Sequence, residues 1–275
     1  MLDILKAVLF GIVEGITEWL PISSTGHMIL VEEFVKMNVS EEFWNLFLVV
    51  IQLGAIMAVV ILFWKKIWPF GKKKKSGRFY VKTDIIMLWL KIVVACVPAA
   101  IVGVLFDDKL DELFYHPWCV AIALIVFGIA FIIIENRNKH MTPHITKLKD
   151  ISFQTAALIG VFQLIAAIFP GTSRSGATIV GALLIGVSRT VAAEFTFFLA
   201  IPVMFGASLL KVLKFGLAFT GTELVLLVVG MVVAFLVSML VIRFLMGYIR
   251  KHDFKVFGWY RIVLGATVLL YFALK

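Results

Sequence analysis

Two short polar stretches of this sequence carry residue types that could do acid–base or nucleophilic chemistry. Residues 14–27 (EGITEWLPISSTGH) contain two glutamates, several hydroxyl groups and a histidine. Residues 170–179 (PGTSRSGATI) contain Arg174 between two serines. Carboxylates, hydroxyls and imidazole can move protons or attack phosphorus, and an arginine fork matches phosphate oxygens. Together these groups are suited to binding and cleaving a phosphate ester.

The first stretch contains candidate catalytic groups on both sides of a helix break. Glu14 and Glu18 are four residues apart and share one helix face. Two carboxylates this close in an apolar environment require a cation or an arginine to neutralise them. A pair of surface glutamates, the alternative, would be favoured only on a soluble helix. Pro21 ends this helix. Hydroxyls after it could simply cap the next helix, but capping does not explain His27, a candidate acid, base or nucleophile.

The second stretch is typical of an anion site. N–H groups at a helix start, together with small residues that permit close approach, bind anions. Arg174 lies in the middle of its apolar segment, which argues against the alternative of an arginine reaching to the membrane interface. We assign substrate binding to Ser23, Thr25, Thr172, Ser173, Arg174, Ser175 and Gly176.

The composition places these stretches in a polytopic membrane protein. Of 275 residues, 62% are hydrophobic and 16% are charged, whereas soluble domains carry about 25% charged residues. The net charge of +9 does not indicate nucleic-acid binding, because the basic residues cluster in short loops between apolar runs, as the positive-inside rule describes. Cys96 and Cys119 lie in apolar segments, so no disulfide framework is implied.

The hydropathy pattern predicts an all-α integral membrane protein with six transmembrane helices and two re-entrant helical hairpins. A span needs about 20 apolar residues. The hairpins are predicted over residues 2–31 and 151–187, which the polar stretches interrupt; irregular backbone at membrane depth requires surrounding protein or a water-filled cavity. Eight full spans with slightly polar middles are the alternative. The six spans are predicted at residues 43–64, 84–106, 118–135, 190–213, 223–245 and 256–273.

Loop charges predict the orientation. Residues 65–82, 136–150 and 247–255 are net basic and are expected inside, whereas the mainly acidic residues 107–117 and residues 214–222 are expected outside. The first hairpin then opens to the outside and the second to the inside.

A weak internal repeat predicts two inverted halves, residues 1–150 and 151–275, each with a hairpin and three spans. An offset of 149 residues relates five pairs: Gly11 and Gly160, Glu14 and Gln163, Pro21 and Pro170, Ser24 and Ser173, Asn45 and Glu194. The roles of Asn45, Gln52 and Glu194 stay open.

The chain resembles the bacterial undecaprenyl-diphosphate phosphatases, also called bacitracin-resistance proteins. The resemblance covers essentially the whole chain and rests on residues 14–27, 49–56 (VVIQLGAI), 170–179 and 192–202 (AAEFTFFLAIP). It implies a multi-pass inner-membrane hydrolase, and we expect its site to open to the periplasmic face. Such an enzyme converts undecaprenyl diphosphate to the monophosphate, recycles the lipid carrier for cell-wall synthesis and lowers bacitracin sensitivity.

The resemblance further implies the site. Glu14 and Glu18 would be catalytic and would hold a divalent cation, Mg²⁺ or Ca²⁺, since both ions prefer carboxylate oxygens. Ser24 or His27 would be the nucleophile, and Arg174 would bind phosphate. The expected partners are a polyprenyl diphosphate and membrane lipids, and a homodimer is left open.

Two rival functions remain. Inverted repeats and midplane hairpins also occur in transporters, so the alternative is a transporter or flippase of a lipid phosphate. Such a carrier would need Arg174 to bind phosphate, but it would not need the acid, base and nucleophile candidates of residues 14–27. A scaffold without a small-molecule site leaves the intramembrane Glu and Arg residues unexplained.

The orientation can be tested by cysteine labelling from outside whole cells. Leu110→Cys should react and Lys73→Cys should not, because acidic residues 107–117 are predicted outside and the basic loop inside. The unsubstituted chain gives the background from its two cysteines. Labelling at position 73 but not at 110 would reverse the orientation.

Overall fold

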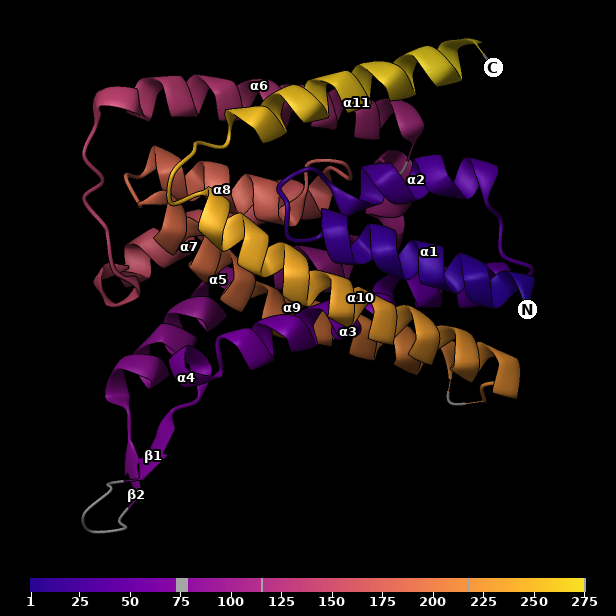
Figure 1. The fold of residues 1–275 in the computed structure, drawn as a ribbon, viewed down its shortest axis with the longest axis horizontal. Helices are drawn as coiled ribbons and strands as arrows, with labels where there is room; N and C mark the ends of the chain where they lie inside the picture. Colours follow the sequence, from indigo (N-terminus) through magenta and orange to yellow (C-terminus); the bar gives the residue numbers. More distant parts are fainter. Residues whose placement is uncertain (73–78, 115, 217, 275) are drawn as a thin grey trace.

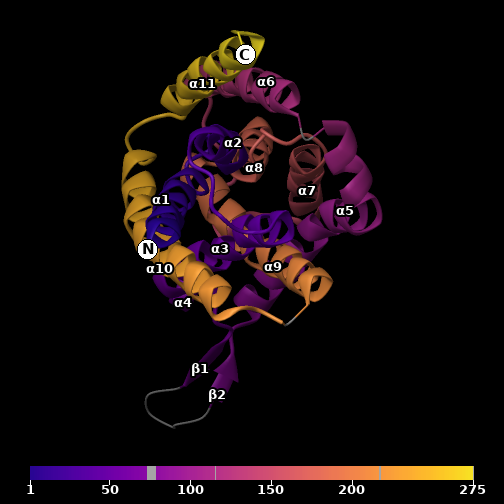
Figure 2. The ribbon, with the colours of Figure 1, turned by 90° about the vertical axis from the view of Figure 1, so that its right-hand side faces the viewer.

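The computed structural model describes residues 1–72, 79–114, 116–216 and 218–274. Its helices run mostly along the long axis of the molecule, with both termini at one end and a small β-hairpin projecting at the other (Figure 1). Seen along that axis, α2 and α8 lie near the middle of a ring formed by the longer helices (Figure 2). Helix α8 is buried along most of its length, whereas most residues of α2 are half-buried.

Six helices in the described part of the chain are long and apolar enough to cross a membrane, which confirms the predicted number of spans. One boundary differs. The helix predicted to end at residue 106 continues to Phe114, because residues 107–114 contain no glycine or proline that would stop it. The six helices are α3 (Glu41–Leu62), α5 (Thr83–Phe114), α6 (Pro117–Arg137), α9 (Arg189–Phe215), α10 (Gly221–Tyr248) and α11 (Lys255–Leu274).

The basic loop between α3 and α5 contains secondary structure that the sequence did not predict. A short helix, α4 (Trp64–Ile67), is followed by β1 (Phe70–Lys72) and β2 (Phe79–Val81), which pair antiparallel. Residues 73–78, which carry most of the lysine run used to predict orientation, lie outside the described residues. Two short 3₁₀ turns, Asn138–His140 and Leu148–Asp150, lie in the segment that links the two predicted halves.

The two interrupted segments form helical hairpins. The first consists of α1 (Leu2–Thr17) and α2 (Ser24–Phe34), and the second of α7 (Phe153–Ile168) and α8 (Arg174–Leu184). In the first, the N–H of Asn38 donates to the Asp3 carboxylate at 3.1 Å, so the chain returns to where it began. In the second, Ile145 and Val187 form a parallel bridge across the open end. Their re-entry into a membrane stays a prediction.

The helix pairing has the pattern that two repeats would produce. Helix α1 packs along α10, and α7 packs in the same way along α5, while α3 packs on α9 and α6 on α11. At the α6–α11 crossing the contact is reciprocal: a Cβ on either Gly128 or Gly258 would lie 2.7 Å from the other's carbonyl oxygen. Small residues permit such close approach of membrane helices. The inverted orientation of the halves stays a prediction.

Gly54 lies at a close crossing of α3 and α10, where a Cβ atom would be 2.0 Å from the Met231 carbonyl oxygen. Gly54→Ala should therefore lower the free energy of unfolding by about 1–3 kcal/mol through overpacking. Gly206, inside α9, has no atom within 4 Å of a built Cβ, so Gly206→Ala should be neutral or stabilising by up to about 1 kcal/mol. Thermal unfolding in detergent measures both. If both substitutions changed the unfolding temperature equally, the close contact between α3 and α10 at Gly54 would be contradicted.

Candidate functional site

The two helix breaks have the same local structure. Ser23 precedes α2 and Ser173 precedes α8, with φ of 74° and 68°. In each, the serine Oγ accepts a hydrogen bond from the glycine N–H three residues on, Gly26 at 3.3 Å and Gly176 at 3.1 Å. A left-handed conformation in a residue other than glycine costs about 1–3 kcal/mol and tends to occur at functional sites. The surrounding protein holds both breaks in this conformation.

This shared geometry corrects one pair of the predicted repeat. The counterpart of Ser173 is Ser23, 150 residues away, and not Ser24. The offset changes because Pro21 precedes Ser23 by two positions, whereas Pro170 precedes Ser173 by three. Ser24 and Arg174 consequently occupy the first helical position of α2 and α8. The fold therefore places a hydroxyl and a guanidinium at equivalent points of the two hairpins.

Glu18 joins the two hairpin tips. One oxygen of its carboxylate accepts from Nη2 of Arg174 at 3.0 Å, and the other accepts from the Ser24 hydroxyl at 2.9 Å. The Ser175 hydroxyl also donates to the Glu18 carbonyl at 3.2 Å. The side chains of Glu18 and Arg174 are 7% and 12% exposed, so this ion pair is largely shielded from solvent. Glu18, Ser24 and Arg174 thus lie together at the hairpin tips.

Several buried polar atoms at the tips have no hydrogen-bond partner among the described residues. They are Oε1 of Glu14, Nε1 of Trp19, Oε1 of Gln163, Oγ1 of Thr172 and Nε of Arg174. Buried polar groups are usually paired, because an unpaired one costs about 1–3 kcal/mol. All five belong to the two breaks or to the helix turns that lead into them. Donors and acceptors without partners are thus concentrated around the hairpin tips.

His27 lies next to this cluster but is bonded elsewhere. Its Nδ1 is 2.7 Å from the Ser23 carbonyl oxygen, and its Nε2 is 2.7 Å from the hydroxyl of Tyr260. A carbonyl can only accept, so we assign the ring proton to Nδ1; neutral Nε2 then accepts from Tyr260. Both ring nitrogens are therefore engaged, whereas the Ser24 hydroxyl points at a carboxylate. Of the two candidate nucleophiles, Ser24 is the one whose side chain donates to a carboxylate.

Arg261 on α11 is a structural residue that the sequence reasoning missed. It is fully buried, and its Nη2 donates to the carbonyl oxygens of Gly171 at 3.0 Å and Thr172 at 2.7 Å. Its Nη1 donates to Pro21 O at 3.3 Å, and its Nε to Leu124 O at 3.4 Å. One side chain thus contacts both breaks. The available signal was an arginine inside the apolar run 256–273, where an ionisable residue is functional by default.

The residues with open roles lie around or outside the site. Glu194 pairs with Nζ of Lys66 at 2.6 Å and so connects α9 to α4. Asn45 is exposed and Gln52 is half-buried, both on α3. Thr25 is half-buried in the first turn of α2. Asn45 and Glu194, which the repeat offset relates, therefore lie in different surroundings.

A divalent cation fits part of this arrangement. Both oxygens of Glu18 already have partners, and the described residues contain no group of three or more His, Cys, Asp or Glu side chains placed to hold a metal. Glu14 is buried, and its Oε1 has no hydrogen-bond partner among the described residues. Mg²⁺ is commonly bound by one or two carboxylates together with substrate phosphates and water. The donor set therefore suits an ion that arrives with a phosphate.

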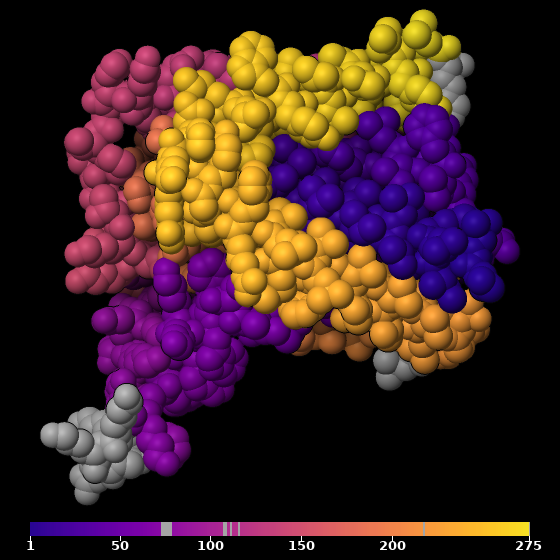
Figure 3. All heavy atoms as spheres, in the orientation of Figure 1, coloured from indigo at the N-terminus to yellow at the C-terminus, as the bar shows by residue number. Residues whose placement is uncertain are grey.

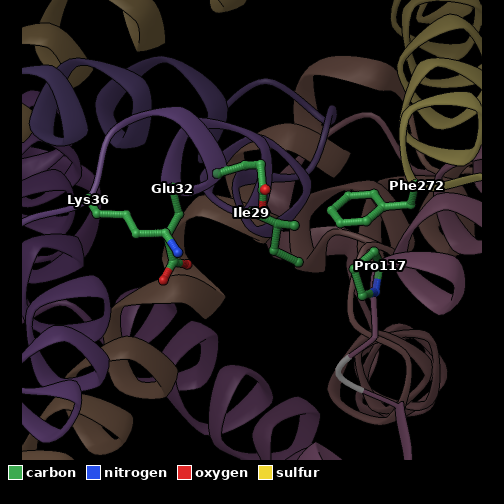
Figure 4. A pocket seen from close by; sticks show the side chains of 6 residues that line it. Ile29, Glu32, Lys36, Pro117 and Phe272 are labelled. Carbon is green, nitrogen blue, oxygen red and sulfur yellow. The ribbon is translucent and has the colours of Figure 1, made fainter. Parts of the chain in front are cut away.

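A separate hollow of about 210 Å³ lies near the end of α2. In Figure 4, Glu32 and Lys36 lie on one side of this hollow and Pro117 and Phe272 on the other, with Ile29 between them. The predicted site residues do not line it. The hollow has both apolar and charged lining residues, and it lies at the end of the molecule that contains the two termini.

These features define a polytopic membrane protein in which the tips of two helical hairpins bring a glutamate, a serine and an arginine together. The sequence model of the family described as bacitracin resistance protein BacA matches residues 7–267, and the chain belongs to this family.

Relatives resemble the chain over almost their full length. It is 66% identical over 271 residues to undecaprenyl-diphosphatase 1 of Clostridium acetobutylicum, covering 98% of each chain. It is 64% identical over 275 residues to undecaprenyl-diphosphatase of Desulfitobacterium hafniense, covering 100% of this chain and 98% of the relative.

Arg261→Met should destabilise the protein, because it leaves buried carbonyl oxygens of both breaks without their donor. Each unpaired carbonyl costs about 1–3 kcal/mol, so the thermal unfolding temperature in detergent should fall markedly. Arg243→Met, at an exposed arginine of α10, is the matched control and should change little. An Arg261→Met protein as stable as this control would show that Arg261 does not hold the breaks.

Proposed function

We propose that this chain hydrolyses undecaprenyl diphosphate to undecaprenyl phosphate and inorganic phosphate. Curated relatives that are 54–66% identical are named undecaprenyl-diphosphatases. The structural observation that carries the proposal is the set of unpartnered buried polar atoms beside a bonded serine, glutamate and arginine. A diphosphate headgroup would satisfy the free donors, and its prenyl tail would stay in lipid.

The geometry supports Ser24 as the nucleophile and Glu18 as its base. The Ser24 hydroxyl already donates to the Glu18 carboxylate, so that carboxylate takes the proton while Oγ bonds to the terminal phosphorus. The bond from phosphorus to the bridging oxygen breaks, and protonated Glu18 returns its proton to the leaving lipid monophosphate. A water then gives a proton to Glu18 and attacks the phosphorus of phosphoserine. The bond from phosphorus to Oγ breaks, Glu18 returns the proton to Oγ, and inorganic phosphate is released.

Arg174 is the principal phosphate ligand in this proposal. Its guanidinium pairs with Glu18 and donates from Nη1 to the Thr196 carbonyl at 3.0 Å. Its Nε–H has no partner among the described residues and is available to a phosphate oxygen. Thr172 adds a buried hydroxyl, and the α8 N-terminus adds backbone N–H groups. The arginine thereby replaces the water that a phosphate loses at this depth.

Glu14 would hold the divalent cation through its free carboxylate oxygen. When bound there, Mg²⁺ or Ca²⁺ would neutralise phosphate charge and so favour attack by an oxygen nucleophile. We therefore propose that hydrolysis requires Mg²⁺ or Ca²⁺.

The site is proposed to open to the periplasmic face of the bacterial inner membrane. The first hairpin opens at the end of the molecule where both termini lie (Figure 1), and the hollow of Figure 4 lies near the α2 end of that hairpin. A headgroup could approach from this end while basic loops stay in the cytoplasm.

A lipid-phosphate flippase is the second candidate, favoured by the paired hairpins and the repeated helix pairing. It accounts for Arg174 but not for the hydrogen bond from Ser24 to Glu18.

Turnover separates the two functions. Purified protein in detergent with Mg²⁺ or Ca²⁺ should release phosphate from a prenyl diphosphate, and a chelator should abolish the release. Glu18→Gln and Ser24→Ala should each lower kcat by about 10²-fold or more, and Arg174→Lys should impair the reaction because it loses the planar fork. Ser208→Ala removes a buried hydroxyl elsewhere in the fold and should remain active.

The nucleophile is identified by trapping. Phosphate on Ser24 with His27→Ala retaining measurable turnover is the expected result, and acid-labile phosphate on His27 would contradict it. If the folded protein releases no phosphate but moves labelled lipid phosphate across a reconstituted bilayer, the protein is a flippase and the hydrolase proposal is wrong.

A further inference from the structure

A second, larger cavity lies at the end of the molecule that carries the basic loops. Its volume is about 500 Å³, and it lies between the end of α6, the segment after it, the α8–α9 junction and the end of α10. Figure 3 shows the surface hollowed between the 138–145 segment and α10, with atoms of the second hairpin at its base. None of the proposed catalytic or substrate-binding residues lines it.

The cavity carries more positive charge than its acidic residue neutralises. Arg137, Lys139 and Arg250 line it, are exposed, and make no ion pair among the described residues. Its acidic lining residue is Glu135, which is 1% exposed and already paired with Arg189, whose Nε donates at 2.8 Å. The Phe254 N–H also donates to Glu135 at 3.0 Å. Glu135 is therefore fully satisfied, and three cations remain around the cavity.

Further polar donors face the same space. Helix α9 begins here, and its N-cap residue Ser188 makes no side-chain capping hydrogen bond. The first N–H groups of a helix carry partial positive charge and attract anions. His144, which also lines the cavity, is exposed. The cations and the helix start together favour an anion with several acceptor oxygens.

Apolar side chains lie at the same cavity. Leu184 is 41% exposed and Met141 is 48% exposed, and both line it. A free inorganic ion gains nothing from such neighbours, whereas a lipid would place its first acyl carbons against them. Basic pockets between membrane helices on the cytoplasmic side are typical binding sites for anionic headgroups.

We propose that this cavity binds the phosphate headgroup of an anionic glycerophospholipid through Arg137, Lys139, Arg250 and the start of α9. The bound lipid would connect α6, the second hairpin and α10. Because α8 begins with Arg174 and ends at this cavity, occupancy would stabilise the hairpin that presents the phosphate-binding arginine. This proposal does not depend on which reaction the hairpin tips perform.

Native mass spectrometry from bilayer nanodiscs tests the site. Wild-type protein in mixed phosphatidylglycerol and phosphatidylcholine should retain phosphatidylglycerol selectively. The Arg137→Gln, Arg250→Gln double variant should retain about 25-fold less, from about fivefold per lost surface charge. The Lys65→Gln, Lys147→Gln control removes the same charge from exposed basic residues outside the cavity and should retain nearly as much as wild type.

Thermal unfolding in detergent provides the second readout. Phosphatidylglycerol should raise the unfolding temperature of wild type and of the control but not of the cavity variant, and phosphatidylcholine should raise none. Equal losses in both double variants would show bulk charge attraction and overturn the proposal. Equal stabilisation by inorganic phosphate alone would also overturn it, since the occupant would then be the free ion.

Discussion

The structure depends on one buried guanidinium that satisfies the carbonyl oxygens of two broken helices. The residues that link two helices of a hairpin have carbonyl groups without an intrahelical partner, and such groups need another donor when they are buried. Arg261 supplies donors to Pro21, Gly171 and Thr172 at once, which an arginine can do because it carries five N–H groups. Both hairpin tips are thereby held next to α11, and the remaining geometry of the site follows from that position.

Once the tips are adjacent, opposite charges can neutralise one another at depth. Arg174 from the second hairpin meets Glu18 from the first, and Ser24 completes the contact. An isolated charge of either sign here would be costly, because burial penalises it strongly. Neither hairpin therefore makes a stable site alone. The positive φ of Ser23 and Ser173 adds local strain that the packed surroundings sustain.

The sequence predicted the parts of the molecule that depend on local composition. Six apolar runs became six helices, and proline, glycine and serine marked both breaks. It did not predict Arg261 as the residue joining the breaks, because hydropathy does not say which helix packs beside them. Nor could it show that Asn45 faces outward or that Lys66 is the partner of Glu194, since both depend on tertiary packing.

The central claim is that the two hairpins form a single phosphate site. The most direct measurement is an experimental structure with a prenyl methylenediphosphonate, whose carbon bridge resists hydrolysis. The account predicts that the terminal phosphonate lies within hydrogen-bond distance of both the Arg174 guanidinium and the Ser24 hydroxyl, with the tail between helices. A phosphonate bound to one hairpin alone, or away from Arg174, would contradict it.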